Sequence, residues 1–331
     1  MKPSILFIIL LILIISLIYS GCHLFTPLSR LPSPANFYCL GTQENEGQLF
    51  PLVLQPKHIY GMGLTYAAHF KETGSEFDPD NPPPVFKKSL VSLNRSGAPV
   101  NVPTRQDLIK CAERIEPGLG KKIDKKFKQL PPLLDYEGEL AFILLEDVTW
   151  QKIDNADYIP KLGYFLANDI SARTIAVLGE GKTNCYDYWG ASKSFPGFLP
   201  VGAKIWVPNI QRSNSILCTV ITTKVNGEIR QKQSTSDMMY TPREMLLFIS
   251  KKYPDALPQK GDIVLTGTPG GVAMQVPAWK VWLADVLALN RFTMLQFSIT
   301  SSKSNKKFLK PGDVMEVSGG ILGKIETQIL Q

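Results

Sequence analysis

The sequence predicts a β-rich α+β fold rather than a helical bundle. Its 25 glycines and 25 prolines indicate many turns and loops. Two apolar runs, in residues 134–145 and 163–168, are typical of strands buried on both faces. The Asn-Gly pair at 226–227 predicts a type I′ hairpin, and the TPRE run at 241–244 predicts a capped helix start.

The length and charge of the chain limit the classes of function. The 331 residues are enough for one large domain or two smaller ones, and the net charge of +7 favours anionic partners. We predict no nucleic-acid binding, because no short basic cluster is interleaved with aromatic residues. With only three histidines, a histidine-cluster metal site within one chain is excluded. The five cysteines form no C-x-x-C pair, and their pairing cannot be deduced from spacing.

Residues 1–22 carry one lysine and an apolar run that ends in Tyr19-Ser20-Gly21-Cys22. We interpret this segment as a signal peptide or a membrane anchor. Its end resembles a bacterial lipobox, although Tyr19 stands where leucine is usual. The sequence thus predicts a protein associated with a membrane through its N-terminus, outside the cytoplasm, as a periplasmic lipoprotein or an anchored protein. Residues 23–56 are predicted to be a linker and N-terminal extension.

A helical turn in residues 66–72 places His69 and Glu72 at positions i and i+3, on one face. A carboxylate in that position can orient and charge an imidazole for general-base work. An ordinary surface pair is the alternative. Farther on, Lys87 and Lys88 are neighbours on a predicted strand, so one of them can face a pocket while the other faces solvent.

Residues 107–128 read as a basic helical stretch, for which a solvated face is the expected account and attraction to anionic lipid the alternative.

The run LDYEGELAFILL at 134–145 places Glu137 and Glu139 on one face of a strand that enters the core. Two like charges at that point are costly unless a cation lies between them, and a hard divalent cation suits oxygen ligands. Asp135 shares their face and is a further candidate ligand. The alternative is an exposed strand end with solvated glutamates.

Two later segments add candidate site residues. Asp169 ends the strand of residues 163–168, a place where sites are often built, although a capping turn explains it equally well. Lys193 lies among aromatic residues in the loop 189–202, where it either packs its stem on the rings or faces a substrate carboxylate. Residues 261–271 form a strand and a small-residue loop without a phosphate-binding motif. Residues 310–317 and 323–330 predict two closing strands.

In this order, YGMGLTYAAHFKE, DYEGELA, GYFLANDISAR, GASKSF, VNGEIRQKQSTSDM, GDIVLTGTPGGV and LKPGDVMEV resemble the fumarylacetoacetate hydrolase family. The resemblance covers residues 57–331 and implies a catalytic domain with the mixed β-roll fold of the family's C-terminal domain. It also implies a homodimer and one divalent cation, Mg²⁺ first, with Mn²⁺ or Ca²⁺ as alternatives.

The resemblance implies a role for each matching residue. The metal ligands fall on Glu137, Glu139 and Asp169, which demotes Asp135. The catalytic residues fall on His69, Glu72 and Lys193. The substrate-binding residues fall on Lys88, Arg173 and Thr268.

The implied function is a metal-dependent hydrolase or lyase that acts on a small anionic 2-oxo or 1,3-dicarbonyl acid, with C–C bond hydrolysis of an acylpyruvate-like compound first. The alternatives are an oxaloacetate-type tautomerase or decarboxylase, an isomerase or hydratase of 2-oxo acids, and a non-catalytic tethered binding protein. The chain departs from the family pattern at three places: the long connection 107–128, Thr174-Ile175-Ala176 after the S-A-R run, and an insertion at 276–305. The insertion is open to three interpretations: a lid, an oligomer contact or a membrane-facing element.

Overall fold

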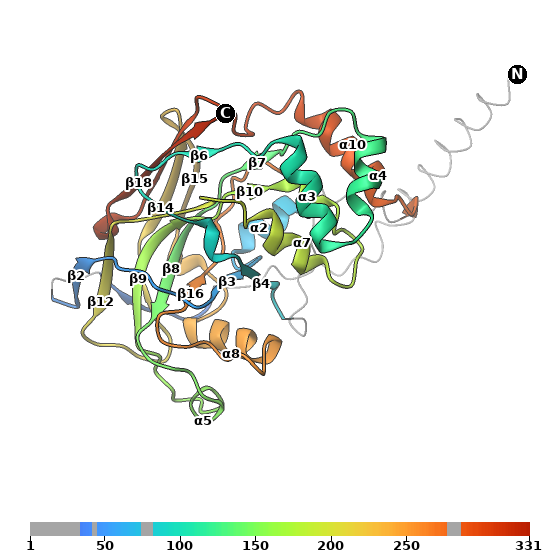
Figure 1. Cartoon of the computed structure of the whole chain (residues 1–331). Helices are drawn as coiled ribbons and strands as arrows, with labels where there is room; N and C mark the ends of the chain where they lie inside the picture. The colour runs from blue at the N-terminus through green and yellow to red at the C-terminus, as the bar shows by residue number, and fades with distance from the viewer. Residues whose placement is uncertain (1–33, 42–44, 74–81, 277–285) are drawn as a thin grey trace, which may run out of the picture.

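Two mixed β-sheets organise the chain in this computed structural model, which describes residues 34–41, 45–73, 82–276 and 286–331 (Figure 1). The sheets pack against one another through Leu166, Ile221 and Val317. The larger sheet has the order β2 (Gly47–Pro51), β12 (Lys204–Pro208), β9 (Leu162–Asn168), β8 (Gly138–Leu144), β16 (Ile263–Leu265), β3 (Ile59–Met62), β4 (Val85–Lys88), and a branch adds β11 (Leu199–Val201) and β5 (Leu93–Arg95).

The second sheet has five strands in the order β15 (Glu228–Ser234), β14 (Val220–Val225), β17 (Val314–Ser318), β18 (Lys324–Leu330), β6 (Val100–Asn101). Two short pairs complete the strands: β1 (Tyr38–Leu40) with β13 (Ser215–Leu217), and β7 (Leu134–Asp135) with β10 (Ser171–Ala172). Parallel pairs such as β3 and β16 occur beside antiparallel pairs such as β8 and β9. The predicted β-rich α+β fold is confirmed.

The helices lie around these sheets, with 3-10 turns at η2 (Leu90–Ser92), η3 (Thr235–Asp237) and η4 (Gly320–Leu322). They are α2 (Ala67–Thr73), α3 (Arg105–Ile115), α4 (Leu119–Lys126), α5 (Trp150–Ile153), α6 (Arg173–Val177), α7 (Cys185–Ser192), α8 (Pro242–Lys252) and α10 (Arg291–Ser302). α3, α4, α6, α7 and α10 share one hydrophobic core, whereas α8 contributes to another beside β3 and β16. Figure 1 shows this separation, with α8 on the opposite side of the larger sheet from α3 and α10.

β8 is the central strand for function, and it is buried along its whole length. Leu140, Phe142 and Leu144 face one core, while Ala141 and Ile143 face another. The predicted strand with both faces buried is therefore confirmed. Strands that connect two cores hold their register firmly, because a slip by one residue would exchange the two faces.

The local turn and cap signals are also confirmed. Asn226 and Gly227 both have positive φ, 51° and 83°, and they connect β14 to β15 as a type I′ turn requires. Thr241 and Glu244 form the expected capping box at the start of α8. Ser171, two residues after Asp169, lies in β10, and its hydroxyl donates to the Asp169 carbonyl oxygen.

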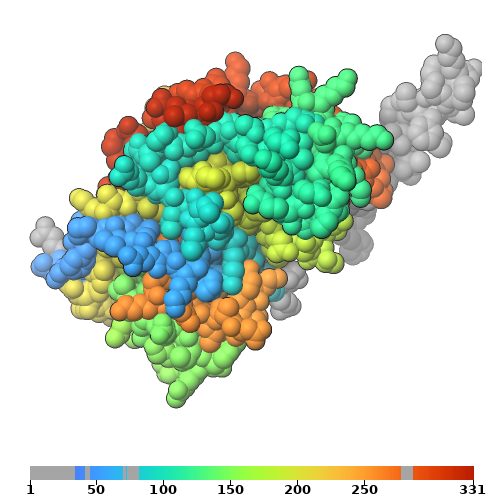
Figure 2. Space-filling view, viewed as in Figure 1, coloured from blue at the N-terminus to red at the C-terminus, as the bar shows by residue number. Residues whose placement is uncertain are grey.

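The basic connection forms α3 and α4, and its cationic side chains are exposed: Lys110, Arg114, Lys121, Lys122, Lys125, Lys126 and Lys128. This exposure agrees with the expected solvated face, and the choice between it and attraction to anionic lipid stays a prediction. In Figure 2 the residues of α3 and α4, coloured teal to green, form the upper right part of the visible face of the folded chain.

The end of the 276–305 insertion packs onto that connection. Arg291, the first residue of α10, forms two hydrogen bonds of 2.6 Å with the Glu116 carboxylate that follows α3. Phe292 packs against Phe127, and Leu295 and Ile299 enter the same core. Two of the three departures from the family pattern, the connection 107–128 and the end of the insertion, therefore pack on each other. Residues 277–285, with Trp279, Trp282 and Leu283, lie outside the described residues.

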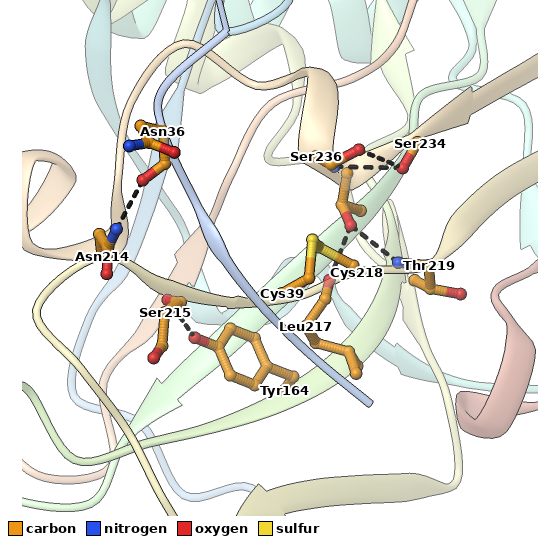
Figure 3. Close-up of a disulfide and its surroundings, with 11 residues drawn as sticks. Asn36, Cys39, Tyr164, Asn214, Ser215, Leu217, Cys218, Thr219, Ser234 and Ser236 are labelled. Atoms are coloured by element: carbon orange, nitrogen blue, oxygen red, sulfur yellow. Dashed lines mark hydrogen bonds between the residues drawn. A yellow bond between two sulfur atoms is a disulfide. The ribbon is translucent and has the colours of Figure 1, made fainter. Parts of the chain in front are cut away.

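A disulfide joins Cys39 in β1 to Cys218 after β13 (Figure 3). The strands run parallel, with Cys39 opposite Ile216. The side-chain amide of Asn214 also donates to the Asn36 carbonyl oxygen at 2.6 Å. These contacts attach the N-terminal extension to the rest of the fold.

The predicted membrane location needs correction. Within residues 34–41, 45–73, 82–276 and 286–331, no helix is long and apolar enough to cross a membrane. Residues 1–22, on which the signal peptide, the lipoprotein and the anchor were predicted, lie outside this part of the chain. The prediction of a membrane-associated protein outside the cytoplasm is therefore wrong on these findings, and we do not retain it.

Candidate active site

Three buried carboxylates meet at the ends of β8 and β9. Glu137 precedes β8, Glu139 lies in it, and Asp169 follows β9. Gly138 pairs with Asn168 across the two antiparallel strands, which places the three acidic residues beside one another. One oxygen from each carboxylate lies within 4.8 Å of the others, and each residue is at most 5% exposed. Such a group could hold a metal ion, because divalent cations of the hard type prefer carboxylate oxygens.

Backbone contacts fix this arrangement. The Asp169 amide donates to the Glu137 carbonyl oxygen at 2.8 Å, and the Glu137 amide donates to the side-chain oxygen of Asn168 at 3.1 Å. The Gly267 amide donates to the Glu139 carboxylate at 2.8 Å. The last contact connects Glu139 to the loop after β16.

Gly138 is required for the approach of the second sheet to the carboxylates. A Cβ at this position would lie 2.2 Å from the Thr223 hydroxyl oxygen in β14 and 3.0 Å from Val317 in β17. Contacts this short do not occur without a displacement, because protein interiors are close-packed. The glycine between the two glutamates therefore leaves room for the neighbouring sheet.

Three cationic side chains lie among the carboxylates. The Lys88 ammonium pairs with Asp169, and the Lys193 ammonium pairs with Glu137 and, at 2.8 Å, with Asp169. Arg173 pairs with Glu137 and, through Nε at 2.8 Å, with Asp135. Lys88 and Lys193 are 5% and 3% exposed, so these are interior charges whose burial is costly unless each is paired.

The pKa values in this group move in opposite directions. Burial favours the neutral form of Glu137, but Arg173 and Lys193 outweigh it and lower its pKa to about 2. Burial raises the pKa of Glu139 well above its ordinary value, and the charges of Asp169 and Glu137 raise it further. Among the described side chains no cation pairs with Glu139, so Glu139 retains a proton more readily than Glu137.

The lysines differ in the same way. Burial lowers the pKa of Lys88, although Asp169 opposes that effect. For Lys193, the attraction of Asp169 and Glu137 outweighs burial, and its pKa is raised. Lys88 therefore gives up its proton more readily than Lys193.

His69 and Glu72 lie on one face of α2, as their spacing predicts. Nδ1 of His69 is 3.6 Å from a Glu72 carboxylate oxygen, and the imidazole is buried. Both Glu72 oxygens accept from the Gly271 amide at 2.8 Å. Burial favours the neutral form of Glu72, but its hydrogen bonds with His69 and Gly271 lower its pKa. The charge of His69 also contributes to the lowered pKa of Glu137.

Thr268 lies in the loop that contacts both parts of the site, because the Gly267 amide binds Glu139 and the Gly271 amide binds Glu72. Its hydroxyl accepts from the Gln231 side chain at 2.7 Å and donates to the Gly138 carbonyl oxygen at 3.3 Å. Gln231 in turn accepts from the Gly138 amide at 3.0 Å. The hairpin strand β15 thus supports the strand that carries the glutamates.

The structure brings together seven of the nine predicted site residues: Lys88, Glu137, Glu139, Asp169, Arg173, Lys193 and Thr268. His69 and Glu72 pair with each other, and Glu72 binds Gly271 in the loop that carries Thr268. Their individual roles stay predictions. Sequence reasoning missed the amide of Asn168, the amide of Gln231 and the contacts of Asp135 with Arg173. The only sequence signals for these were the position of Asn168 beside Asp169 and the shared face of Asp135 with the glutamates.

A sequence model of the C-terminal domain family of fumarylacetoacetate (FAA) hydrolase matches residues 58–330. This chain belongs to the fumarylacetoacetate hydrolase family. Oxaloacetate tautomerase of Bacillus subtilis is 32% identical over 224 residues, which are 67% of this chain and 62% of that relative. The match therefore spans less than two thirds of the tautomerase. An uncharacterized protein of Methanocaldococcus jannaschii is also 32% identical, over 66% of this chain and 74% of its own.

Solved structures of the family share the fold. Fumarylpyruvate hydrolase of Pseudomonas aeruginosa, solved with Mn²⁺ and pyruvate, is 18% identical with a TM-score of 0.53, over 93% of this chain and 99% of that one. Fumarylacetoacetate hydrolase of Exiguobacterium antarcticum is 24% identical with a TM-score of 0.52, over 85% and 77% of the two chains. At these identities the likeness shows the fold, and it confirms the predicted family architecture. Among the relatives are a tautomerase and hydrolases.

Proposed function

We propose that this protein is a divalent-cation-dependent enzyme that acts on a small anionic 2-oxo acid. The observation that carries the proposal is the buried group of Glu137, Glu139 and Asp169, with ligand oxygens within 4.8 Å of one another. Carboxylate oxygens suit Mg²⁺, Mn²⁺ or Ca²⁺ better than softer ions. We expect Mg²⁺ first, and the Mn²⁺ in the structure of the Pseudomonas hydrolase supports a divalent cation.

The charges around the group support an acidic substrate. Glu137, Glu139, Asp169 and Asp135 supply four carboxylates, whereas Lys88, Lys193 and Arg173 supply three cations. With all four carboxylates ionised, the group has one negative charge too many, and a divalent cation would leave it with one positive charge too many. A substrate carboxylate would remove the excess, because unpaired charge in a buried site is costly.

The roles that we assign follow from this arrangement. A bound cation would polarise the keto oxygen of the substrate and stabilise the negative charge that develops there. His69, oriented by Glu72, would accept or donate the proton that moves. Lys88 and Lys193 would exchange part of their pairing with Asp169 and Glu137 for the substrate carboxylate, with Arg173 and Thr268 beside it.

Keto–enol tautomerisation of an oxaloacetate-like diacid is the first candidate reaction. His69 would remove a proton from the carbon next to the keto group, the C=C bond would form, and the former keto oxygen would receive a proton. The 32% identity with the Bacillus tautomerase favours this candidate.

C–C bond hydrolysis of an acylpyruvate-like compound is the second candidate, and it is the reaction that the sequence placed first. His69 would take a proton from a water molecule that attacks the distal carbonyl carbon. The C–C bond would then break, and its electron pair would take up a proton on the pyruvate side. The fold shared with the Pseudomonas hydrolase supports this candidate.

The experiment is an assay of oxaloacetate enolisation and acylpyruvate cleavage with Mg²⁺ or Mn²⁺, and again after removal of the cation. We expect His69→Asn to lower turnover by about 10²- to 10⁴-fold, the usual contribution of a general base, while cation binding is kept. Glu137→Gln should lose both. Glu116→Gln removes a carboxylate that pairs with Arg291 at the start of α10; it is the control and should keep full activity.

Two results would contradict the proposal. One is full turnover by Glu137→Gln or His69→Asn. The other is cation binding without turnover of any substrate in the panel, which would indicate a non-catalytic binding protein that kept the fold.

A further inference from the structure

Asp135 is a buried carboxylate to which the proposed reaction assigns no role. It is fully buried in β7, two residues before Glu137. Its side chain makes four hydrogen bonds. One oxygen accepts from the amides of Tyr136 at 2.9 Å and Ala273 at 2.8 Å. The other accepts from Nε of Arg173 at 2.8 Å and from the amide of Met274 at 3.1 Å.

These bonds use the full acceptor capacity of an ionised carboxylate. Three of the four donors are backbone amides, whose positions the fold fixes. Asp135 is therefore a rigid anion, and the one mobile group that it holds is the Arg173 side chain. Burial of the Asp135 carboxylate would be too costly without these four donors.

Arg173 transmits this contact to the cation site. While Nε binds Asp135, Nη2 of the same guanidinium pairs with Glu137. Two lysines and one further carboxylate then continue an alternating row of charges: Asp135, Arg173, Glu137, Lys193, Asp169, Lys88. Asp135 is the end of the row that is attached to the backbone.

We infer that Asp135 is a positioning residue for the cation site: it holds Arg173 in place, offsets its charge, and thereby sets how tightly Glu137 and its neighbours bind a divalent cation. Without the negative charge of Asp135, the guanidinium would repel an incoming cation. It would also be free to pair with Glu137 alone and to compete for the oxygen that a cation needs. This inference rests on the proposed cation site.

The test is a calorimetric titration of the full chain with Mn²⁺, without substrate, in the parent protein and in Asp135→Asn. We expect the affinity to fall about 10- to 100-fold, as is usual when a partner behind a metal ligand is lost. The matched control is Asp262→Asn. Asp262 is also fully buried and accepts from the amides of Lys57, His58 and Gln259, and it also contacts the His58 ring, but it makes no contact with the carboxylate group. We expect it to lower thermal stability without changing Mn²⁺ affinity.

A double-mutant cycle separates positioning from general support of the fold. If Asp135 acts through Arg173, then Asp135→Asn should cost almost no further Mn²⁺ affinity in an Arg173→Gln background. In Asp135→Asn the charge of Arg173 loses its partner, and the single variant could fail to fold for that reason. The Arg173→Gln background removes this charge, so the test stays valid.

Two results would overturn the inference: unchanged Mn²⁺ affinity in Asp135→Asn, or an equal further loss in the parent and Arg173→Gln backgrounds. No Mn²⁺ binding by the parent protein would overturn both this inference and the proposed function. Weakened binding in Asp135→Asn together with no turnover of any substrate would uphold the inference and reject the function.

Discussion

At the scale of single residues, the site is a balance between buried carboxylates and the cations among them. Glu137 lies between Arg173 and Lys193 and is held ionised, whereas Glu139 accepts a hydrogen bond from the Gly267 amide and has a raised pKa. A cation shared by the three carboxylates would favour ionised Glu139. Cation binding and proton release should therefore be linked at this residue.

This linkage predicts that Mn²⁺ affinity rises with pH. Folding raises the pKa of Glu139 above its unfolded-state value of about 4.5. The protonated carboxyl therefore contributes to the stability of the folded chain in full at a pH below 4.5. This contribution is lost as the pH rises through the pKa of the folded state. Across the same range, Mn²⁺ must displace the Glu139 proton. Titrations in buffers of different ionisation enthalpy should show proton release, and Glu139→Gln should abolish it. Affinity that does not change with pH in the parent protein would contradict this assignment.

The sequence predicted these residues well but not their partners. The spacing of Glu137 and Glu139 and the i, i+3 spacing of His69 and Glu72 are local features that a strand or helix preserves. The contact between Asp135 and Arg173 spans 38 residues and depends on the pairing of β7 with β10. No local pattern contains that information, so Asp135 was considered only as a third ligand.

At the scale of elements, the approach of the second sheet to β8 determines the geometry of the site. Thr223 and Val317 from β14 and β17 occupy the space beside Gly138. The sequence showed only that Gly138 separates two glutamates. Why no side chain is tolerated there became evident only from the packing of the two sheets.

We predict that Gly138→Ala destabilises the protein by about 1–3 kcal/mol, the usual cost of overpacking a core. It should also weaken Mn²⁺ binding, because β8 cannot move without displacing both glutamates. Gly202→Ala is the control: a Cβ there would lie 3.5 Å from its nearest neighbour in Leu166, an ordinary contact. Chemical denaturation and Mn²⁺ titration of both variants would check this, and equal behaviour of the two would refute the packing argument.

The sequence predicted where helices and turns begin better than it predicted how the helices pack. The capping box at Thr241 and the turn at 226–227 are determined by local hydrogen bonds and by positive φ. In contrast, the packing of α10 on the α3–α4 connection depends on the pair of Arg291 with Glu116, which are 175 residues apart. Of the three interpretations of the insertion, the described part of it, α10, supports none directly, because it packs against this chain's own core.

At the scale of the whole molecule, the N-terminal extension is attached to the fold by the pair of β1 with β13 and by the disulfide between Cys39 and Cys218 (Figure 3). The five cysteines left this pairing open in the sequence, since the two residues are 179 positions apart. The homodimer that the resemblance implies stays a prediction at this scale.

We predict that the disulfide stabilises the folded chain by about 2–4 kcal/mol, since it closes a long loop in the unfolded state. The free energy of unfolding, measured with and without reductant, should differ by this amount, and Cys39→Ser should abolish the difference. Cys185→Ser is the control, because Cys185 forms no disulfide in the described part of the chain. An equal effect of reductant on the parent and on Cys39→Ser would contradict the prediction.

The most direct test of the cation site is a calorimetric titration of the parent protein and Glu137→Gln with Mn²⁺ at neutral pH. The account predicts saturable binding of a single ion per chain in the parent protein and no measurable binding in the variant, with the variant still folded by circular dichroism. Equal binding by the two proteins, or no binding by the parent, would contradict the assignment of Glu137, Glu139 and Asp169 as a cation site.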